Sequence, residues 1–338
     1  MRASPTIYSM ILLLVIAVAF GQPAPKKIVI VGLDDAAASE LRKSAPPNVR
    51  LVTPASGQVA DEVSNADALI APQLTLGELH AGKQLRWVQI LNAGVEDVLP
   101  LIRNTSITLT NLKVVLAPEV ADHAMALLLA LTRGLYETIP SRGKWEAPES
   151  LAQLTELRGK TAVIVGAGGV GTGIAERAAS FGMTIVGVDP KESAPSSFFR
   201  QMVKPDQIDK VLSLADVVFL TVPETPATKG MMGATQFQEM KRGSYFIAVS
   251  RGTVYSMDAL VQALSTRRLA GAGVDVTDPE PLPRNHPLWK FKNVVITPHI
   301  AGASDRSLSR VLELLRQNIQ RFAAGEPLLN TVDRNQGY

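Results

Sequence analysis

The sequence contains no cysteine, and this absence excludes disulfide bonds, zinc–thiolate sites, cysteine nucleophiles and lipid-modified cysteines. Histidine is scarce, so any imidazole chemistry must come from His80, His123, His286 or His299. The net charge is only +3, and the chain has no block of Lys and Arg of the kind that binds nucleic acid. We therefore predict neither a metal site nor a nucleic-acid partner.

An apolar run near the N-terminus, Met10–Phe20 (MILLLVIAVAF), follows Arg2. Its length is typical of a signal-peptide core and falls short of the roughly 20 residues that a membrane span needs. We interpret residues 1–21 as a signal-peptide-like leader and expect export to the periplasm. The alternative is an uncleaved anchor. Lys26 and Lys27 follow the run, and by the positive-inside rule they would keep the protein cytoplasmic, tethered to the membrane only through this leader.

The rest of the 338-residue chain is long enough for two domains and alternates between short β-branched runs and helical stretches. The runs that we predict to be strands are Lys27–Gly32, Arg50–Thr53, Ala66–Ala71, Trp87–Leu91, Ile107–Leu112, Thr161–Val165, Thr184–Val188, Val217–Thr221, Tyr245–Val249, Gly271–Val276 and Val294–Thr297. Such alternation predicts an α/β fold with doubly wound parallel sheets and helices on both faces.

Two longer helices are expected. Val120–Leu131 is apolar nearly all round and follows Pro118, which suits a first helical turn, so we predict a buried helix that links two domains. Near the C-terminus, Ala303–Ala323 has apolar residues at helical spacing and reads as an amphipathic helix.

A glycine-rich turn follows the strand Thr161–Val165. The sequence Gly166–Gly173 (GAGGVGTG) has the spacing G-x-G-x-x-G and leads into a predicted helix, Ile174–Phe181. In this setting Gly166 permits the tight turn, Gly168 lets the backbone approach a pyrophosphate, and Gly171 allows close packing of helix on strand. The pattern predicts a dinucleotide site.

Asp189 ends the next predicted strand, 18 residues after Gly171 (189 − 171). An acid at this point hydrogen-bonds the ribose hydroxyls and repels a 2′-phosphate, which favours NAD over NADP. Lys191 lies close by and keeps NADP open as an alternative, because a cation accepts the phosphate. Pro223 and Thr225, after another predicted strand, are expected to line the same crevice.

Three polar residues follow later strands, where ligands of such sheets bind: Arg251, Glu280 and His299. An arginine binds a substrate carboxylate with two parallel hydrogen bonds, and a histidine supplies a proton near neutral pH. A carboxylate beside the imidazole orients it. Together these residues predict the reduction of a 2-keto acid by hydride transfer, with a 2-hydroxy acid as the product.

Five segments in order resemble the D-isomer-specific 2-hydroxyacid dehydrogenases. They are Val88–Val95 (VQILNAGV), Gly166–Gly173, Val249–Gly252 (VSRG), Gly273–Pro283 (GVDVTDPEPLP) and Thr297–Gly302 (TPHIAG). The resemblance covers most of the chain from about Lys26 and implies catalytic roles for Arg251 as carboxylate binder, His299 as acid/base and Glu280 as its partner. It implies activity on small acids such as glyoxylate or hydroxypyruvate.

The resemblance also assigns the binding residues. The substrate would be held by Ala93, Gly94, Arg251 and His299. The cofactor would contact Gly166, Gly168, Gly169, Val170, Gly171, Asp189, Val222, Pro223, Thr228, Val249, Ser250, Asp275 and Gly302. Asp275 would lie near the nicotinamide carboxamide. Glu280 argues against formate as substrate, because the related formate dehydrogenases carry Gln there. Ala248 departs from the Asn of many members.

For architecture, the resemblance implies a split substrate domain of residues 26–120 and 304–338, an inserted NAD-binding domain of residues 121–303, and homodimers formed through the latter. A second hypothesis is an NADH-sensing, corepressor-like binding protein on the same fold. Among single residues, we interpret His123 as a buried core histidine, with an approach to the active site as the alternative. Trp289 is expected to be a packing anchor, and His80 and His286 to be surface or turn residues.

Overall fold

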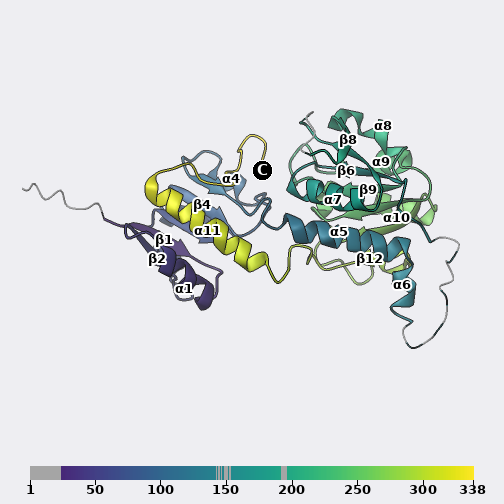
Figure 1. Ribbon diagram of the computed structural model, residues 1–338. Helices are drawn as coiled ribbons and strands as arrows, with labels where there is room; N and C mark the ends of the chain where they lie inside the picture. The colour runs from purple at the N-terminus through teal and green to yellow at the C-terminus, as the bar shows by residue number, and fades with distance from the viewer. Residues whose placement is uncertain are drawn as a thin grey trace, which may run out of the picture.

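The computed structural model describes residues 24–141, 143, 145, 147, 151, 154–191 and 196–338. The predicted leader, residues 1–21, lies outside the described residues. No helix within the described ranges is long and apolar enough to cross a membrane. Figure 1 shows the described chain as two lobes joined at α5 (Ala117–Thr132).

The first lobe contains a parallel sheet that has five strands over the described residues, in the order β2-β1-β3-β4-β5. The strands are β1 (Lys26–Ile30), β2 (Val49–Val52), β3 (Ala68–Ala71), β4 (Trp87–Ile90) and β5 (Thr108–Thr110). The helices of this lobe are α1 (Asp35–Ser44), α2 (Val59–Val63), α3 (Leu76–Ala81), α4 (Leu99–Ile102) and α11 (Ser307–Ala324). All neighbouring strands are parallel, as predicted.

The second lobe contains a larger parallel sheet, with seven strands over the described residues in the order β12-β11-β10-β9-β6-β7-β8. The strands are β6 (Thr161–Val165), β7 (Thr184–Val188), β8 (Phe199–Val203), β9 (Val217–Leu220), β10 (Ser244–Ala248), β11 (Leu269–Val274) and β12 (Val294–Ile296). Its helices are α5, α6 (Leu135–Thr138), α7 (Gly169–Ser180), α8 (Ile208–Leu212), α9 (Ala234–Glu239) and α10 (Met257–Ser265), with short 3-10 turns η2 (Pro205–Gln207), η3 (Gly252–Val254) and η4 (Pro287–Lys290).

Alternation along the strands builds the core of each lobe. In β6, Val163 and Val165 pack on one face of the sheet, while Ala162 and Ile164 pack on the other. Because both faces are covered by helices, these strands are apolar throughout, as a doubly wound parallel sheet requires. The strand order is that of the dinucleotide-binding fold, with its switch point between β6 and β9.

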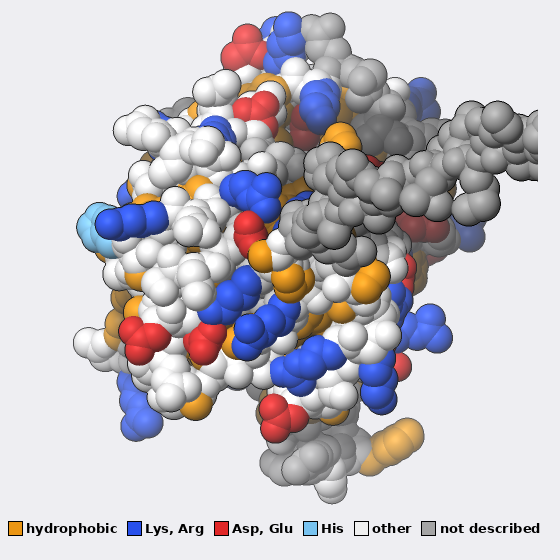
Figure 2. Space-filling model, turned by 90° about the vertical axis from the view of Figure 1, so that its left-hand side faces the viewer, with side chains coloured by type: hydrophobic (Ala, Val, Ile, Leu, Met, Phe, Trp, Pro, Cys, Tyr) orange, Lys and Arg blue, Asp and Glu red, His pale blue; other side chains and the backbone are white. Residues whose placement is uncertain are grey.

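The C-terminal helix α11 returns to the first lobe. It contacts α1, and its apolar face joins the same core as β1. Lys26 at the start of β1 donates hydrogen bonds to the last turn of α11, at the carbonyl oxygens of Phe322 (2.6 Å) and Ala323 (2.9 Å). Figure 2 looks onto this end of the molecule, where Lys and Arg side chains lie among acidic and uncharged ones.

The linking helix α5 packs on α7 and on β10, β11 and β12 of the larger sheet. Pro118 lies in its first turn, as predicted. Two expectations need correction. The strand β8 was missed, and Trp289 is not a packing anchor, because half of its surface (51%) is exposed and its indole N–H donates to the Pro283 carbonyl at 2.9 Å.

Candidate active site

The glycine-rich turn lies at the switch point of the larger sheet, where β6 ends and β9 runs beside it. Gly166 has φ +103°, and a Cβ at this residue would lie 2.9 Å from the backbone nitrogen of Val222. A Cβ on Gly171 would overlap the carbonyl oxygen of Gly166. Gly166 therefore lets the turn pack against the loop after β9, and Gly171 lets the start of α7 pack against the turn itself.

The helix α7 offers its N-terminus at this turn. It begins at Gly169, and its N-cap residue Gly168 provides no side chain to satisfy the first backbone N–H groups. A Cβ on Gly168 would meet open space within 4 Å. Free N–H donors at the positive end of a helix, beside open space, fit the pyrophosphate of a dinucleotide.

Two other predicted cofactor residues have packing roles at this helix. Gly169 faces the segment just before α5, since a Cβ on this glycine would lie 3.3 Å from the Cα of Val114. Val170 is partly buried and packs against the apolar core that α5 and α7 form with the larger sheet. Gly302 similarly lies near Leu116, whose Cδ1 would be 3.5 Å from a Cβ on that glycine. Any contact of these three residues with a cofactor would therefore come mainly from their backbones.

Asp189 follows β7 and connects two loops. Its Oδ2 accepts a hydrogen bond from the Ala167 N–H (2.9 Å), and its Oδ1 accepts one from the Lys191 N–H (3.0 Å). The acid thus fixes the glycine-rich turn, a role that sequence spacing alone did not reveal. Burial, and then the charge of Asp189, raise the pKa of the Tyr338 phenol.

The loop after β9 is braced by Thr228. Its hydroxyl donates to the Pro223 carbonyl (2.6 Å) and accepts from the Thr225 N–H (2.8 Å). The predicted cofactor residue Thr228 therefore shapes the loop from within. At the end of β10, by contrast, Ser250 is buried, and its hydroxyl has no hydrogen-bond partner among the described residues. The neighbouring Val249 is buried as well, so neither of these two predicted cofactor residues offers an open side chain in this structure.

Arg251 lies in the loop that follows β10, and the next residue must be small. A Cβ on Gly252 would overlap the carbonyl of Thr277, which belongs to the loop after β11. The Arg251 guanidinium donates through Nη1 to the Ser250 carbonyl at 2.8 Å. The close packing of these two loops holds Arg251 next to the segment that carries Glu280.

His299 and Glu280 form a direct pair. The imidazole Nδ1 lies 2.8 Å from Oε2 of Glu280, and the other carboxylate oxygen accepts the Thr277 N–H at 2.9 Å. An ionised carboxylate can only accept a hydrogen bond, so we assign the proton of this bond to Nδ1 of His299. The other ring nitrogen, Nε2, is then available to a substrate. Tyr255 donates a hydrogen bond to the Val276 carbonyl of the same loop, and burial and then the charge of Glu280 raise the pKa of its phenol.

Asp275 holds the loop that carries His299. Its buried carboxylate accepts hydrogen bonds from the Thr297 hydroxyl (2.6 Å) and from the N–H groups of Ile300 (3.0 Å) and Ala301 (2.9 Å). The His123 imidazole bonds the same Thr297 hydroxyl at 2.9 Å. His123 is thus hydrogen-bonded and lies beside the loop that carries His299, but 21% of its side chain is exposed, so it is not the buried core histidine that we expected.

This loop has an unusual backbone at the histidine itself. His299 has φ +53°, in the left-handed region that non-glycine residues seldom adopt. Its N–H donates to the Asp275 carbonyl at 2.8 Å, and this bond helps to hold the conformation. The side chain is 44% exposed, so part of the imidazole is open to solvent.

The predicted substrate loop of the first lobe reaches Arg251. A Cβ on Gly94 would overlap the Arg251 guanidinium, so the arginine lies directly over this glycine. The neighbouring Ala93 carbonyl accepts a hydrogen bond from Asn111 at 2.6 Å. Sequence reasoning missed Glu96, which accepts from Arg251 Nε at 2.6 Å. Its only signal was an acidic side chain two residues after a predicted substrate glycine.

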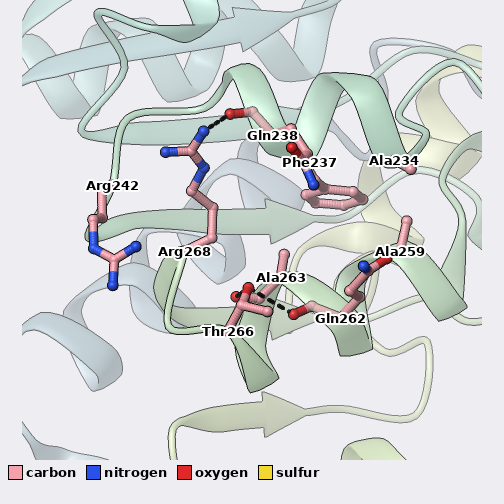
Figure 3. Close-up of a pocket in the computed structure, with 9 residues that line it drawn as sticks. All are labelled: Ala234, Phe237, Gln238, Arg242, Ala259, Gln262, Ala263, Thr266 and Arg268. Atoms are coloured by element: carbon pink, nitrogen blue, oxygen red, sulfur yellow. Dashed lines mark hydrogen bonds between the residues drawn. The ribbon is translucent and has the colours of Figure 1, made fainter.

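Figure 3 shows a separate hollow of about 170 Å³ between α9 and α10, with Arg242 and Arg268 on one side. Arg268 donates to the backbone oxygen of Gln238. The hollow lies toward the amino ends of β10 and β11, whereas Arg251 and Glu280 follow the carboxyl ends. It is therefore not part of the candidate active site.

The two parallel sheets, the glycine-rich turn at the switch point and the paired His299 and Glu280 near Arg251 define a dinucleotide-dependent oxidoreductase. Residues 125–301 match the family described as "D-isomer specific 2-hydroxyacid dehydrogenase, NAD binding domain". The glyoxylate reductase of Korarchaeum cryptofilum is 33% identical over 302 residues, which are 87% of this chain and 88% of that protein. The chain belongs to the D-isomer-specific 2-hydroxyacid dehydrogenase family.

Two further comparisons agree. The human glyoxylate reductase/hydroxypyruvate reductase is 34% identical over 255 residues, 73% of this chain and 77% of that protein. A crystal structure of a D-isomer specific 2-hydroxyacid dehydrogenase from Xanthobacter autotrophicus Py2, in complex with NADPH and MES, has a TM-score of 0.80 at 25% identity and covers 93% of this chain and 100% of its own.

These comparisons confirm the predicted family, the two-sheet α/β fold and the use of a nicotinamide dinucleotide. The protein is a hydroxyacid dehydrogenase. They do not support the second hypothesis of an NADH-sensing binding protein, because the relatives are named as reductases and dehydrogenases.

Proposed function

We propose that this protein reduces small 2-keto acids, of the size of glyoxylate and hydroxypyruvate, with NADH, and oxidises the matching D-2-hydroxy acids in reverse. The observation that carries this proposal is the His299–Glu280 pair, 2.8 Å apart, on the edge of the sheet where Arg251 and the glycine-rich turn also lie. The names of the relatives from Korarchaeum and human support the choice of acids.

Arg251 would bind the substrate. Its planar, permanently charged guanidinium matches a carboxylate with two parallel hydrogen bonds. It lies over Gly94 of the first lobe, so a bound acid would also meet the backbone of that loop. Held between the two lobes, the carbonyl carbon of the acid would have a fixed orientation.

His299 would move the proton. The cofactor, when bound, supplies the hydride for reduction, and negative charge then develops on the carbonyl oxygen. Because Nδ1 faces Glu280, the Nε2 of a protonated His299 is the donor available to that oxygen. Glu280 keeps the ring oriented and stabilises its positive charge. In the oxidation direction, the neutral imidazole accepts the proton of the hydroxyl group.

We propose NAD rather than NADP as the preferred cofactor. The Asp189 carboxylate lies against the glycine-rich turn, where its charge would repel a 2′-phosphate. The alternative rests on Lys191, whose backbone contacts Asp189, and on the NADPH bound by the Xanthobacter relative. The ratio of kcat/KM for NADH and NADPH decides between them. A value above one supports NAD, and a value below one supports NADP.

The reaction is tested by following NADH absorbance with a panel of 2-keto acids, using the chain from Gln22 onward. We expect turnover, and a loss of about 10²- to 10⁴-fold in kcat for His299→Ala, the range for general acid catalysis. His80→Ala, an exposed histidine on α3, is the matched control and should keep full activity. Inactivity with every acid, despite binding of NADH, would refute the proposal.

We also propose that the protein forms a homodimer through the second lobe. Leu135, Ile139 and Trp289 are exposed there, around an apolar hollow of about 370 Å³ beside the edge strand β12. Exposed apolar patches of this kind are typical of subunit interfaces. Light scattering should give twice the mass of one chain, and Ile139→Asp should give single chains. Leu76→Asp, an exposed leucine on α3, should leave the mass unchanged.

For localisation, we propose export directed by residues 1–21. The apolar run after Arg2 supports this proposal. The N-terminal sequence and the compartment of the mature protein test it. A cleaved chain in the periplasm would agree with export, whereas an intact chain in the membrane fraction would show that the leader is a tether.

A further inference from the structure

Glu96 and Arg251 form an ion pair between the two lobes. Oε1 of Glu96 accepts a hydrogen bond from Nε of Arg251 at 2.6 Å, although the residues are 155 positions apart in the sequence. Their side chains are 28% and 26% exposed, so the pair is partly screened by solvent but not free in it. Neither residue belongs to the lobe of the other, and the contact joins the substrate loop to the end of β10.

The pair lies where a substrate carboxylate is expected. A Cβ on Gly94 would lie 2.7 Å from Oε1 of Glu96 and would overlap Arg251. The Glu96 carboxylate therefore sits on the glycine whose backbone would face the substrate, and it contacts the guanidinium that would bind it. It has the charge, the shape and the position of the carboxylate of a 2-keto acid.

The guanidinium is largely engaged in this arrangement. Nη1 donates to the Ser250 carbonyl at 2.8 Å, and Nε donates to Glu96. A carboxylate that approaches the side-on edge of Arg251 needs both Nε and Nη2 for a two-bond contact. Glu96 occupies the Nε position, so the acid has to replace it to gain that contact.

We propose that Glu96 is an internal competitor for the substrate, a carboxylate that occupies Arg251 until the 2-keto acid displaces it. This inference rests on the proposed function of Arg251. Displacement costs the free enzyme one ion pair, so Glu96 weakens substrate binding and sets a higher KM. Once displaced, it leaves a second negative charge beside the bound acid.

The test compares Glu96→Gln with the wild type. Two quantities are measured: the KM for glyoxylate, and the dissociation constant of oxamate, an unreactive monocarboxylate probe, by calorimetry with NADH present. Both should fall about fivefold, the size expected when a partly exposed ion pair no longer competes. Glu96→Ala should agree, because it also removes the hydrogen bond that a Gln amide can retain.

Asp97→Asn is the matched control. It removes the same charge from the next residue of the same loop, whose side chain is exposed. Its KM and oxamate affinity should stay within about twofold of the wild type, because an exposed charge is screened by salt. An equal gain in Asp97→Asn would show a general charge effect and overturn the inference.

The outcomes also separate this inference from the proposed function. If the wild type turns over glyoxylate but both Glu96 variants keep or raise the KM, the function stands and the competitor role is wrong. If no acid is turned over but the Glu96 variants bind oxamate more tightly, the competitor role stands and the proposed reaction fails. No gain in oxamate binding overturns the inference in either case.

Discussion

Replacement of Asp275 by Asn tests how the loop of His299 is held. The carboxylate accepts three hydrogen bonds, two at Oδ1, from Thr297 and Ile300, and one at Oδ2, from Ala301. The amide of Asn has only one acceptor oxygen, and its NH₂ group would face a donor. At least one buried N–H or O–H group is therefore left unpaired, whichever way the amide turns.

The magnitude follows from that loss. One unpaired buried donor costs about 1–3 kcal/mol, so we expect the free energy of unfolding to fall by about 2 kcal/mol. Because the loop also fixes His299, a displacement of about 1 Å lowers kcat by about hundredfold. Denaturant unfolding and steady-state kinetics measure the two effects on the same preparation.

Asp216→Asn is the control. Asp216 accepts from the Thr161 N–H (2.8 Å) and pairs with Lys241 (2.7 Å) at the opposite, amino end of the sheet. It should lower stability and leave kcat unchanged. If Asp275→Asn loses stability but keeps full kcat, the argument that Asp275 positions His299 is wrong.

Three further predictions concern single residues. Glu280→Gln removes the charge that stabilises the protonated His299, and kcat in reduction should fall by about 10²-fold in NADH assays. Gly94→Ala should displace the Arg251 guanidinium and raise the glyoxylate KM about tenfold, with little change in unfolding temperature. Glu119→Gln should be less stable than the wild type above pH 4.5, the ordinary pKa of this carboxyl group, because the pKa of Glu119 is lowered in the folded protein.

The sign of the Glu119 effect is fixed by its neighbours. Burial alone would raise its pKa, but hydrogen bonds from Arg310 and Ser307 outweigh burial and lower it. The wild-type gain is therefore present above pH 4.5 and is lost as the pH falls below it. Unfolding at about pH 7 and about pH 3.5 measures this. A difference in the free energy of unfolding between wild type and variant that persists in acid would contradict the reasoning.

For Gly94→Ala, the control is Gly77→Ala, because residue 77 has room for a methyl group.

Much of the fold was predictable because its signals are local. The glycine-rich turn, the strand before it and the acid after the next strand lie within one βαβ unit. The missed strand β8 has the burial pattern of an edge: Phe199 and Val203 are buried, but Arg200 and Gln201 are exposed. An edge strand bordered by solvent does not need the continuous apolar run that identifies a central one.

The candidate site was predictable where its partners share a lobe. Glu280 and His299 follow neighbouring strands, and the family resemblance implied their pairing. The contact of Glu96 with Arg251 joins two lobes, and no local spacing encodes it. The role of Asp275 was only partly foreseen, because its hydrogen bonds to the 297–301 loop depend on the exact path of that loop.

The alignment of the two lobes therefore depends on the segments that cross between them. The chain passes once before α5 and once before α11, and Glu119 joins these crossings. Its carboxylate accepts from Ser307 at 2.7 Å and pairs with Arg310, which also donates to the Val115 carbonyl at 3.0 Å. Because Arg251 lies on one lobe and Gly94 on the other, a change at this junction alters their separation without touching either residue. Glu119→Gln should therefore raise the KM for glyoxylate as well as lower stability, and a stability loss with an unchanged KM would show that the junction holds the fold but not the site.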